Sequence, residues 1–231
     1  VAFFTLFSFY KIGNKVANKD VSKWWILLYI GSWLPHFYFK TGLIDPLFNL
    51  LIFLAIYHVY ALSNNETNRS KHRLLAGLFL GLAVLTKGPV AILIAILCLA
   101  VYLIVTKFKS AIRLKDVVLI SLVSFGVVFI WFATVLLKHG LAYGNWFLNE
   151  FITYQIRLFR TEDADHGGPF VYHFIVLLIG CFPASLFLFK KHKENKKVLF
   201  NTWMWISLAV VLLLFSIVKT KIVHYSSFCY F

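Results

Sequence analysis

Long apolar stretches alternate with short polar segments along the whole chain. Several of them approach or exceed the roughly 18 residues that indicate a membrane-spanning helix. The pattern predicts about eight hydrophobic segments, at residues 1–10, 24–39, 46–62, 74–85, 90–106, 117–137, 170–189 and 199–218. We therefore expect an all-α, polytopic membrane bundle that forms a single transmembrane domain over residues 1–231.

Composition agrees with this pattern and excludes an ordinary soluble domain. Hydrophobic residues make up 61% of the chain and charged residues 14%, and the mean hydropathy is +0.81. The three cysteines lie in apolar stretches without paired spacing, which is typical of packed residues. The chain starts at Val1 within an apolar stretch and stops at Phe231 in what resembles the start of another helix. We expect a fragment that is cut at both ends.

The distribution of positive charge predicts the orientation of the segments. If residues 11–23 face the cytoplasm, so do the connections at 63–73, 107–116 and 190–198. These four connections hold 16 of the 23 Lys and Arg residues, as the positive-inside rule predicts. The net charge of +14 then follows from topology, and nucleic-acid binding is not expected.

Candidate chemistry lies in the opposite, outer connections. Thr86-Lys87-Gly88-Pro89 separates two apolar segments, and glycine followed by proline favours a turn between helices. The preceding segment, 74–85, spans about 18 Å as a helix, which is less than the membrane core and would leave Lys87 in a recess. Two interpretations remain open: Lys87 is a cation at the edge of the membrane, or it binds a functional group there.

Asp45 precedes Pro46 at the start of the next apolar segment. Its carboxylate suits the first turn of a helix, where it would interact favourably with the helix dipole. An acidic group at the lipid–water boundary also suits binding of a metal, a lysine or a sugar hydroxyl. The two roles are compatible.

The long outer connection, 138–169, interleaves aromatic and polar residues, which include Glu150 and Arg157. This pattern predicts a helix lying in the membrane interface. A polar loop follows, with Glu162, Asp163, Asp165 and His166 before Gly167-Gly168-Pro169. These groups can act in acid–base chemistry or bind a metal. An ordinary solvated loop remains the alternative, because no spacing matches a zinc motif.

The last outer segment contains Lys219, Lys221, His224 and Tyr225. The two lysines and the histidine are either anchors at the membrane surface or ligands of an anionic group such as phosphate. Lys87 is expected on the same side. Together these groups suggest a clamp for a phosphate attached to a membrane lipid.

Four motifs together carry a resemblance to a known family. Asp45 before a helix, Thr86-Lys87-Gly88-Pro89, His166-Gly167-Gly168-Pro169-Phe170-x-Tyr172 and Lys219-x-Lys221-x-x-His224-Tyr225 follow the order seen in polyprenyl-phosphate-dependent glycosyltransferases. The chain resembles the aminoarabinose transferases of lipid A and the related protein mannosyltransferases. This resemblance implies a GT-C membrane fold in the bacterial inner membrane, with interfacial helices and a periplasmic site.

The resemblance also implies roles for individual residues. Asp45 and Lys87 would be catalytic, with Lys87 paired to the donor phosphate. His166 would face the same phosphate, through a divalent metal such as zinc if one is bound. Further substrate-binding residues would be Lys221, His224, Tyr225, Arg157 and Glu150. The family's main general base would lie upstream of Val1, so we expect the isolated fragment to be inactive.

The implied reaction transfers a sugar from a polyprenyl-phosphate donor to a lipid A-like, protein or glycan acceptor, with inversion at the anomeric carbon. This chain has Gly167 and His173 where many relatives carry an arginine and an aromatic residue. A transporter, or a ligase or polymerase of lipid-linked glycans, is the alternative function. Transporters usually place polar groups near the middle of the bilayer, often in paired repeats, and neither feature is found here.

Overall fold

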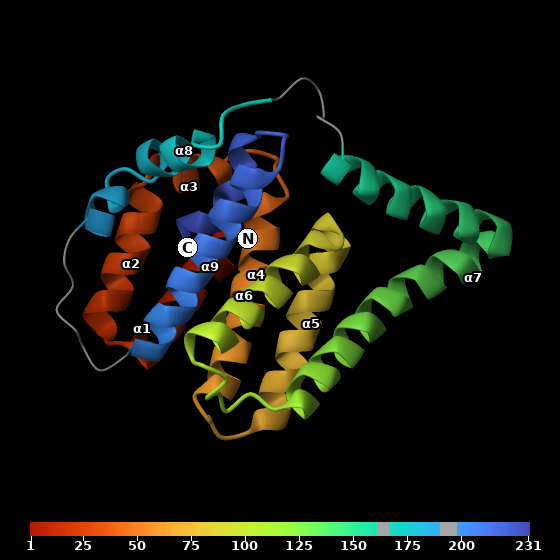
Figure 1. The fold of residues 1–231 in the computed structure, drawn as a ribbon, viewed down its shortest axis with the longest axis horizontal. Helices are drawn as coiled ribbons and strands as arrows, with labels where there is room; N and C mark the ends of the chain where they lie inside the picture. Colours follow the sequence, from red (N-terminus) through yellow and green to blue (C-terminus); the bar gives the residue numbers. More distant parts are fainter. Residues whose placement is uncertain (161–166, 190–197) are drawn as a thin grey trace. The chain divides into compact units, whose positions relative to one another are not determined.

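The computed structural model describes residues 1–160, 167–189 and 198–231, and its elements over these residues are all helices (Figure 1). The chain divides into two compact units. Unit 1 comprises Val1–Leu50 and Gly168–Phe231, and unit 2 comprises Leu51–Gly167. Helix α4 (Asp45–Ser63) begins in unit 1 and continues in unit 2.

Unit 1 is built around aromatic residues of its first two helices and the C-terminal segment. Its other elements are α1 (Ala2–Val16), α2 (Lys19–Gly31), α3 (Trp33–Tyr38), α8 (Tyr172–Gly180), η1 (Ala184–Phe189), α9 (Val198–Ile217) and η2 (Val223–Tyr230). Phe9 stacks on Trp25 with ring centroids 4.4 Å apart, and Trp25 Nε1 donates to the Phe231 carbonyl at 2.9 Å. The end of the chain is thereby tied to the start of the unit.

Unit 2 contains the rest of α4 with α5 (Arg69–Lys87), α6 (Val90–Val105) and α7 (Leu114–Arg160). Helix α5 packs closely along the first part of α7. A Cβ atom on Gly77 would lie 2.7 Å from the Ile120 carbonyl oxygen, and one on Gly81 would lie 2.9 Å from that of Ser124. Small residues four positions apart thus let the two backbones approach, as in many membrane helix pairs.

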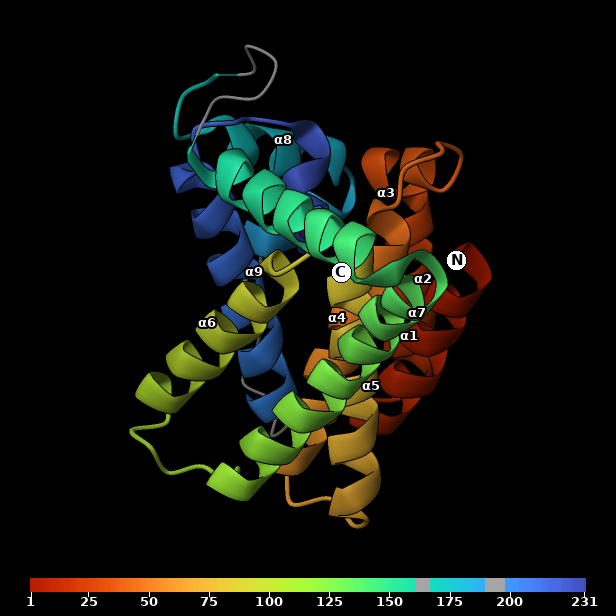
Figure 2. The same ribbon diagram turned by 90° about the vertical axis from the view of Figure 1, so that its right-hand side faces the viewer.

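Helix α7 bends at Gly140, whose φ of 82° and ψ of 167° interrupt the helical backbone. The two parts diverge clearly on either side of the bend (Figures 1 and 2). The second part carries exposed aromatic side chains, among them Trp146 at 57% and Tyr154 at 48%. This confirms the prediction of a separate helix within the connection 138–169.

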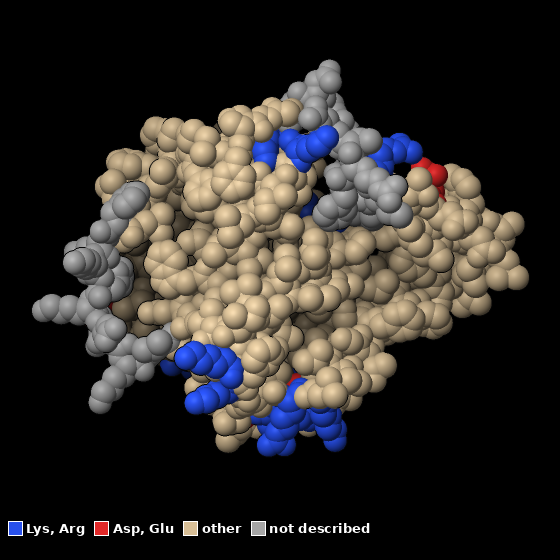
Figure 3. All heavy atoms as spheres, viewed as in Figure 1, with Lys and Arg blue, Asp and Glu red and all other residues tan. Residues whose placement is uncertain are grey.

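Among the described residues, three helices are long and apolar enough to cross a membrane: Asp45–Ser63, Leu114–Tyr154 and Leu199–Ile217. Helix α6 is apolar but shorter. On the face shown in Figure 3, charged side chains form a few groups within a largely uncharged surface. The structure therefore has the surface and the helices of a membrane-embedded protein.

Three predicted segments differ from the structure. The segment 24–39 is divided at Ser32, whose hydroxyl donates to the Leu28 carbonyl at 2.7 Å and the Cys181 carbonyl at 3.1 Å. The segment 170–189 is not one helix, because it contains the nine-residue α8, a turn at 181–183 and then η1. Helix α5 starts at Arg69 and has 19 residues, about 28 Å, so the helix is longer than the predicted apolar segment 74–85. The recessed position of Lys87 stays a prediction.

Candidate functional site

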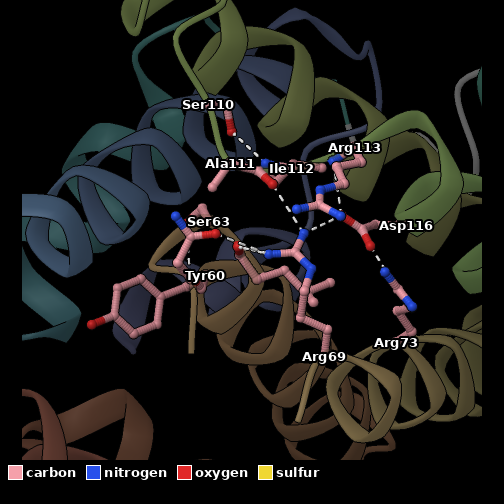
Figure 4. Close-up of polar contacts among 11 residues, drawn as sticks. Tyr60, Ser63, Arg69, Arg73, Ser110, Ala111, Ile112, Arg113 and Asp116 are labelled. Carbon is pink, nitrogen blue, oxygen red and sulfur yellow. Dashed lines mark hydrogen bonds and ion pairs between the residues drawn. The ribbon is translucent and has the colours of Figure 1, made fainter. Parts of the chain in front are cut away.

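The connections 63–73 and 107–116, both predicted to face the cytoplasm, are hydrogen-bonded to each other in unit 2. Arg69, at the start of α5, donates from Nη2 to the Ala111 carbonyl at 2.9 Å and also pairs with Asp116 (Figure 4). Lys87 ends the same helix. Because α5 is continuous, Lys87 lies at the opposite end of unit 2 from these two connections, as the predicted topology requires.

The turn after Lys87 has the predicted form. Gly88 adopts a φ of 78°, and its N–H donates to the Val84 carbonyl at 2.7 Å, which closes the end of α5. A residue with a Cβ is strained in this conformation. Pro89 then precedes α6 with a φ of −65°. The turn holds Lys87 half-buried at the end of its helix.

Asp45 lies in the first turn of α4, in unit 1, with a relative exposure of 2%. A carboxylate at this position interacts favourably with the positive end of the helix dipole. One turn later, Asn49 Nδ2 donates to Ser227 Oγ at 2.9 Å, and both side chains are buried. This bond ties the helix that carries Asp45 to η2, which carries His224 and Tyr225.

Lys221 lies between α9 and η2 and is buried, with 6% exposure. Its ammonium donates to the carbonyls of Phe215 at 3.2 Å, Ser216 at 2.7 Å and Val218 at 2.5 Å. An ammonium has three N–H groups, and all three cap the C-terminal end of α9. Burial lowers the pKa of Lys221. The sequence indicated an anchor or a phosphate ligand and did not predict this cap.

Gly168, in the glycine-containing motif, lies against the side chain of Lys221. A Cβ atom on Gly168 would lie 3.0 Å from Lys221 Cγ and 3.9 Å from Tyr172 Cδ2. On η2, the His224 and Tyr225 rings are half-buried and 5.3 Å apart. Two motifs more than 50 residues apart in the sequence thus meet within unit 1.

His173 is a buried polar residue that the sequence analysis noted only as a departure from the family pattern. It has no exposed surface, and its Nδ1 shares a hydrogen bond of 2.9 Å with Ser226 Oγ. Its Nε2 has no hydrogen-bond partner among the described residues. The Tyr172 ring packs edge-on against it at 5.1 Å. The sequence feature that could have identified it is a histidine inside an apolar stretch.

The remaining predicted residues are placed as follows. Glu150 and Arg157 are exposed on the second part of α7, in unit 2 with Lys87. His166 lies outside the described residues, as do the three carboxylates of its loop. Over the described part of the chain, no three His, Cys, Asp or Glu side chains are close enough to hold a metal ion. The zinc site predicted at His166 therefore stays a prediction.

Comparison with known proteins decides the family. Residues 1–221 match the Alg9-like mannosyltransferase family. The chain belongs to this family. Alg9-like mannosyltransferases are glycosyltransferases by name, in agreement with the resemblance carried by the four motifs.

Two curated relatives carry the same name. The chain is 27% identical to the undecaprenyl phosphate-alpha-4-amino-4-deoxy-L-arabinose arabinosyl transferase of Wigglesworthia glossinidia brevipalpis, over 99% of this chain and 42% of the relative. The protein of the same name from Enterobacter sp. (strain 638) is also 27% identical, over 82% of this chain and 34% of the relative. The chain thus spans about two fifths of the length of the first of these curated relatives.

A solved structure has the same fold. The crystal structure of ArnT from Cupriavidus metallidurans bound to undecaprenyl phosphate superposes with a TM-score of 0.79 at 16% identity, over 99% of this chain and 42% of that one. This likeness confirms the predicted fold class, an all-α membrane bundle of the GT-C type. The chain therefore corresponds to about two fifths of the length of that structure.

Proposed function

We propose that the full-length protein is a polyprenyl-phosphate-dependent glycosyltransferase. Its donor is a polyprenyl-phosphate-linked sugar, and its acceptor is a lipid such as lipid A, or a protein or glycan. The site lies at the outer, periplasmic face of a bacterial inner membrane. The observation that carries the proposal is the family match over residues 1–221, together with relatives named as undecaprenyl-phosphate aminoarabinose transferases.

In the proposed reaction, an acceptor hydroxyl attacks the anomeric carbon of the sugar while the bond from that carbon to the phosphate oxygen breaks. The acceptor proton passes to a carboxylate base. The polyprenyl phosphate leaves as a monoester and gains negative charge. A cation beside the leaving oxygen therefore stabilises the transition state more than the ground state.

Lys87 is the cation that we assign to this phosphate. Helix α5 and the Gly88 turn hold it at the end of unit 2 opposite the basic connections. Asp45 is assigned to positioning the donor or acceptor, because its buried carboxylate is fixed at the start of α4. Arg157 and Glu150 are assigned to substrate contacts from the second part of α7.

The geometry changes the role that we assign to Lys221. Its three N–H groups all bond to carbonyls at or just after the end of α9, so we propose that it positions His224 and Tyr225 through the turn that it caps. His224 and Tyr225 then contact the donor phosphate. His166 stays a proposed phosphate or zinc ligand.

The test uses purified full-length protein and a polyprenyl-phospho-sugar donor with lipid A as acceptor. Lys87→Ala is expected to reduce transfer by roughly 100-fold or more, and Lys87→Arg to retain a measurable part of it. Lys138→Ala is the matched control, because Lys138 is an exposed lysine in another of the predicted outer connections. Unchanged transfer by Lys87→Ala would contradict the assignment. Substrate flux across vesicles without transfer would favour a transporter instead.

A further inference from the structure

One end of unit 2 carries a cluster of positive charge that the proposed reaction does not use. It is formed where α5 begins and where α6 connects to α7. Five exposed cations, here called the basic end, belong to it: Lys71, Lys107, Lys109, Arg113 and Lys115. Lys87, the cation assigned to the donor phosphate, lies at the other end of α5.

The carboxylates near the basic end are already engaged. Asp116 has no exposed surface; it accepts from Arg73 Nε at 2.6 Å and pairs with Arg69 (Figure 4). Glu66 lies 3.6 Å from His72 Nε2. None of the five cations of the basic end forms an ion pair with a described residue. These five exposed cations are therefore accessible to an anionic partner.

The buried network also fixes the backbone that carries these cations. Arg69 Nη1 donates to the Leu62 carbonyl at 3.1 Å, and its Nη2 donates to the Ala111 carbonyl at 2.9 Å. The Arg113 N–H donates to Asp116 Oδ2 at 2.8 Å. The two connections are thus held together, so that little ordering of the chain opposes binding of a partner at the basic end.

An apolar side chain projects between two of the cations. Lys107 and Phe108 have φ values of 51° and 60°, in the left-handed region that bulky residues seldom adopt. Hydrogen bonds from their N–H groups to Ile104 O at 2.9 Å and Leu103 O at 2.7 Å hold this turn. It leaves Phe108 75% exposed, with Lys109 exposed beside it.

The apolar surface continues on both sides of this turn. Ile104 is 66% exposed in the last turn of α6, and Leu114 is 80% exposed at the start of α7. Cations next to exposed aromatic and aliphatic groups match the boundary between lipid headgroups and acyl chains. A soluble acidic partner would satisfy the cations but would leave these apolar groups in contact with water.

We propose that the basic end is a binding site for anionic phospholipids of the membrane in which the protein is embedded. Lys107 and Lys109 contact the headgroup phosphates, and Phe108 lies against the upper part of the acyl chains. Positive charge that served only to orient the chain during insertion would show no preference among lipids once the protein is folded. A preference for anionic headgroups is therefore the distinguishing property.

The experiment titrates full-length protein in detergent with dioleoyl phosphatidylglycerol or with dioleoyl phosphatidylcholine and counts bound lipid by native mass spectrometry. The wild type is expected to bind the anionic lipid more tightly. The double variant K107Q/K109Q should bind it about 30-fold more weakly, because each lysine near an anionic surface contributes about a factor of five. Phe108→Ser should weaken binding of both lipids and keep the headgroup preference.

The matched control is K40Q/K138Q, which removes two exposed lysines from the predicted outer connections. It should bind both lipids as the wild type does. Equal affinity of the wild type for the two lipids would overturn the proposal, and so would unchanged binding by K107Q/K109Q. The readout is independent of sugar transfer, so these outcomes do not depend on the proposed function.

Discussion

Gly168 lies against the aliphatic stem of Lys221, close enough that a Cβ atom at position 168 would stand 3.0 Å from Lys221 Cγ and 3.3 Å from its Cβ. The absence of a side chain at 168 therefore allows the lysine to reach the carbonyls at the end of α9. This relationship links the glycine-containing motif to the last outer segment.

Replacing Gly168 by alanine should push the Lys221 stem away from α9 and weaken the cap. We expect the free energy of unfolding to fall by about 1–3 kcal/mol, the usual cost of overpacking. Thermal unfolding of the purified full-length protein measures this. Gly42→Ala is the control, because a Cβ at Gly42 would meet nothing within 4 Å. Equal unfolding temperatures for the two variants would show that the contact is unimportant.

Lys221→Met keeps the stem and removes the ammonium. Three carbonyls at the end of α9 then lose their charged donor, at an expected cost of about 1.5–3 kcal/mol in stability. Lys219→Met should have little effect, because Lys219 is exposed. Thermal unfolding and binding of the polyprenyl-phospho-sugar, measured on the same preparations, separate the two roles. Loss of donor binding at wild-type stability would favour direct phosphate contact by Lys221 over capping.

Gly77→Ala tests the close packing of α5 on α7. The new Cβ would meet Val123 Cβ at 2.6 Å and the Ile120 carbonyl at 2.7 Å, and neither can be displaced without moving α7. We expect markedly reduced thermal stability. Gly126→Ala, with nothing within 4 Å of its Cβ, should be neutral or slightly stabilising, since alanine favours a helix over glycine. A tolerated Gly77→Ala would mean that the two helices can separate freely.

Asp116→Asn should disrupt the buried network in Figure 4, because Arg69 and Arg73 would keep their charges without a carboxylate. Removing one partner of a buried ion pair typically costs about 3–5 kcal/mol. Asp20→Asn is the control, since its side chain is 85% exposed and lies 3.9 Å from Lys23 Nζ. Proteolysis between α6 and α7, measured over time, should accelerate in Asp116→Asn and stay unchanged in Asp20→Asn.

The hydropathy pattern predicted the uninterrupted helices well. Helices α4, α6 and α9 agree with the segments 46–62, 90–106 and 199–218 to within about one residue at each end. It failed where polar groups are satisfied inside the fold. The start of α5 is helical although it carries Arg69 and Arg73, because both bond to Asp116, 43 positions or more away. Hydropathy over a local window contains no such information.

The hydropathy pattern also did not predict the breaks within apolar stretches. Ser32 divides α2 from α3 through a bond to Cys181, a residue 149 positions later. Motif order did predict the family, and it indicated that the segments around Gly168 and Lys221 belong together. It did not predict that the Lys221 ammonium caps a helix, because that depends on where α9 ends. The joint role of Asp45, Lys87, His166 and Lys221 stays a prediction.

The bend in α7 requires glycine at position 140 because of the backbone conformation there, and not because a side chain would lack room. A Cβ on Gly140 would meet nothing within 4 Å, yet its φ of 82° with a ψ of 167° is open almost only to glycine among the natural residues. The mirror image of this conformation is ordinary extended backbone. A D-amino acid introduced there by chemical ligation should therefore preserve the direction of the second part of α7, whereas its L-enantiomer, identical in volume and polarity, should not.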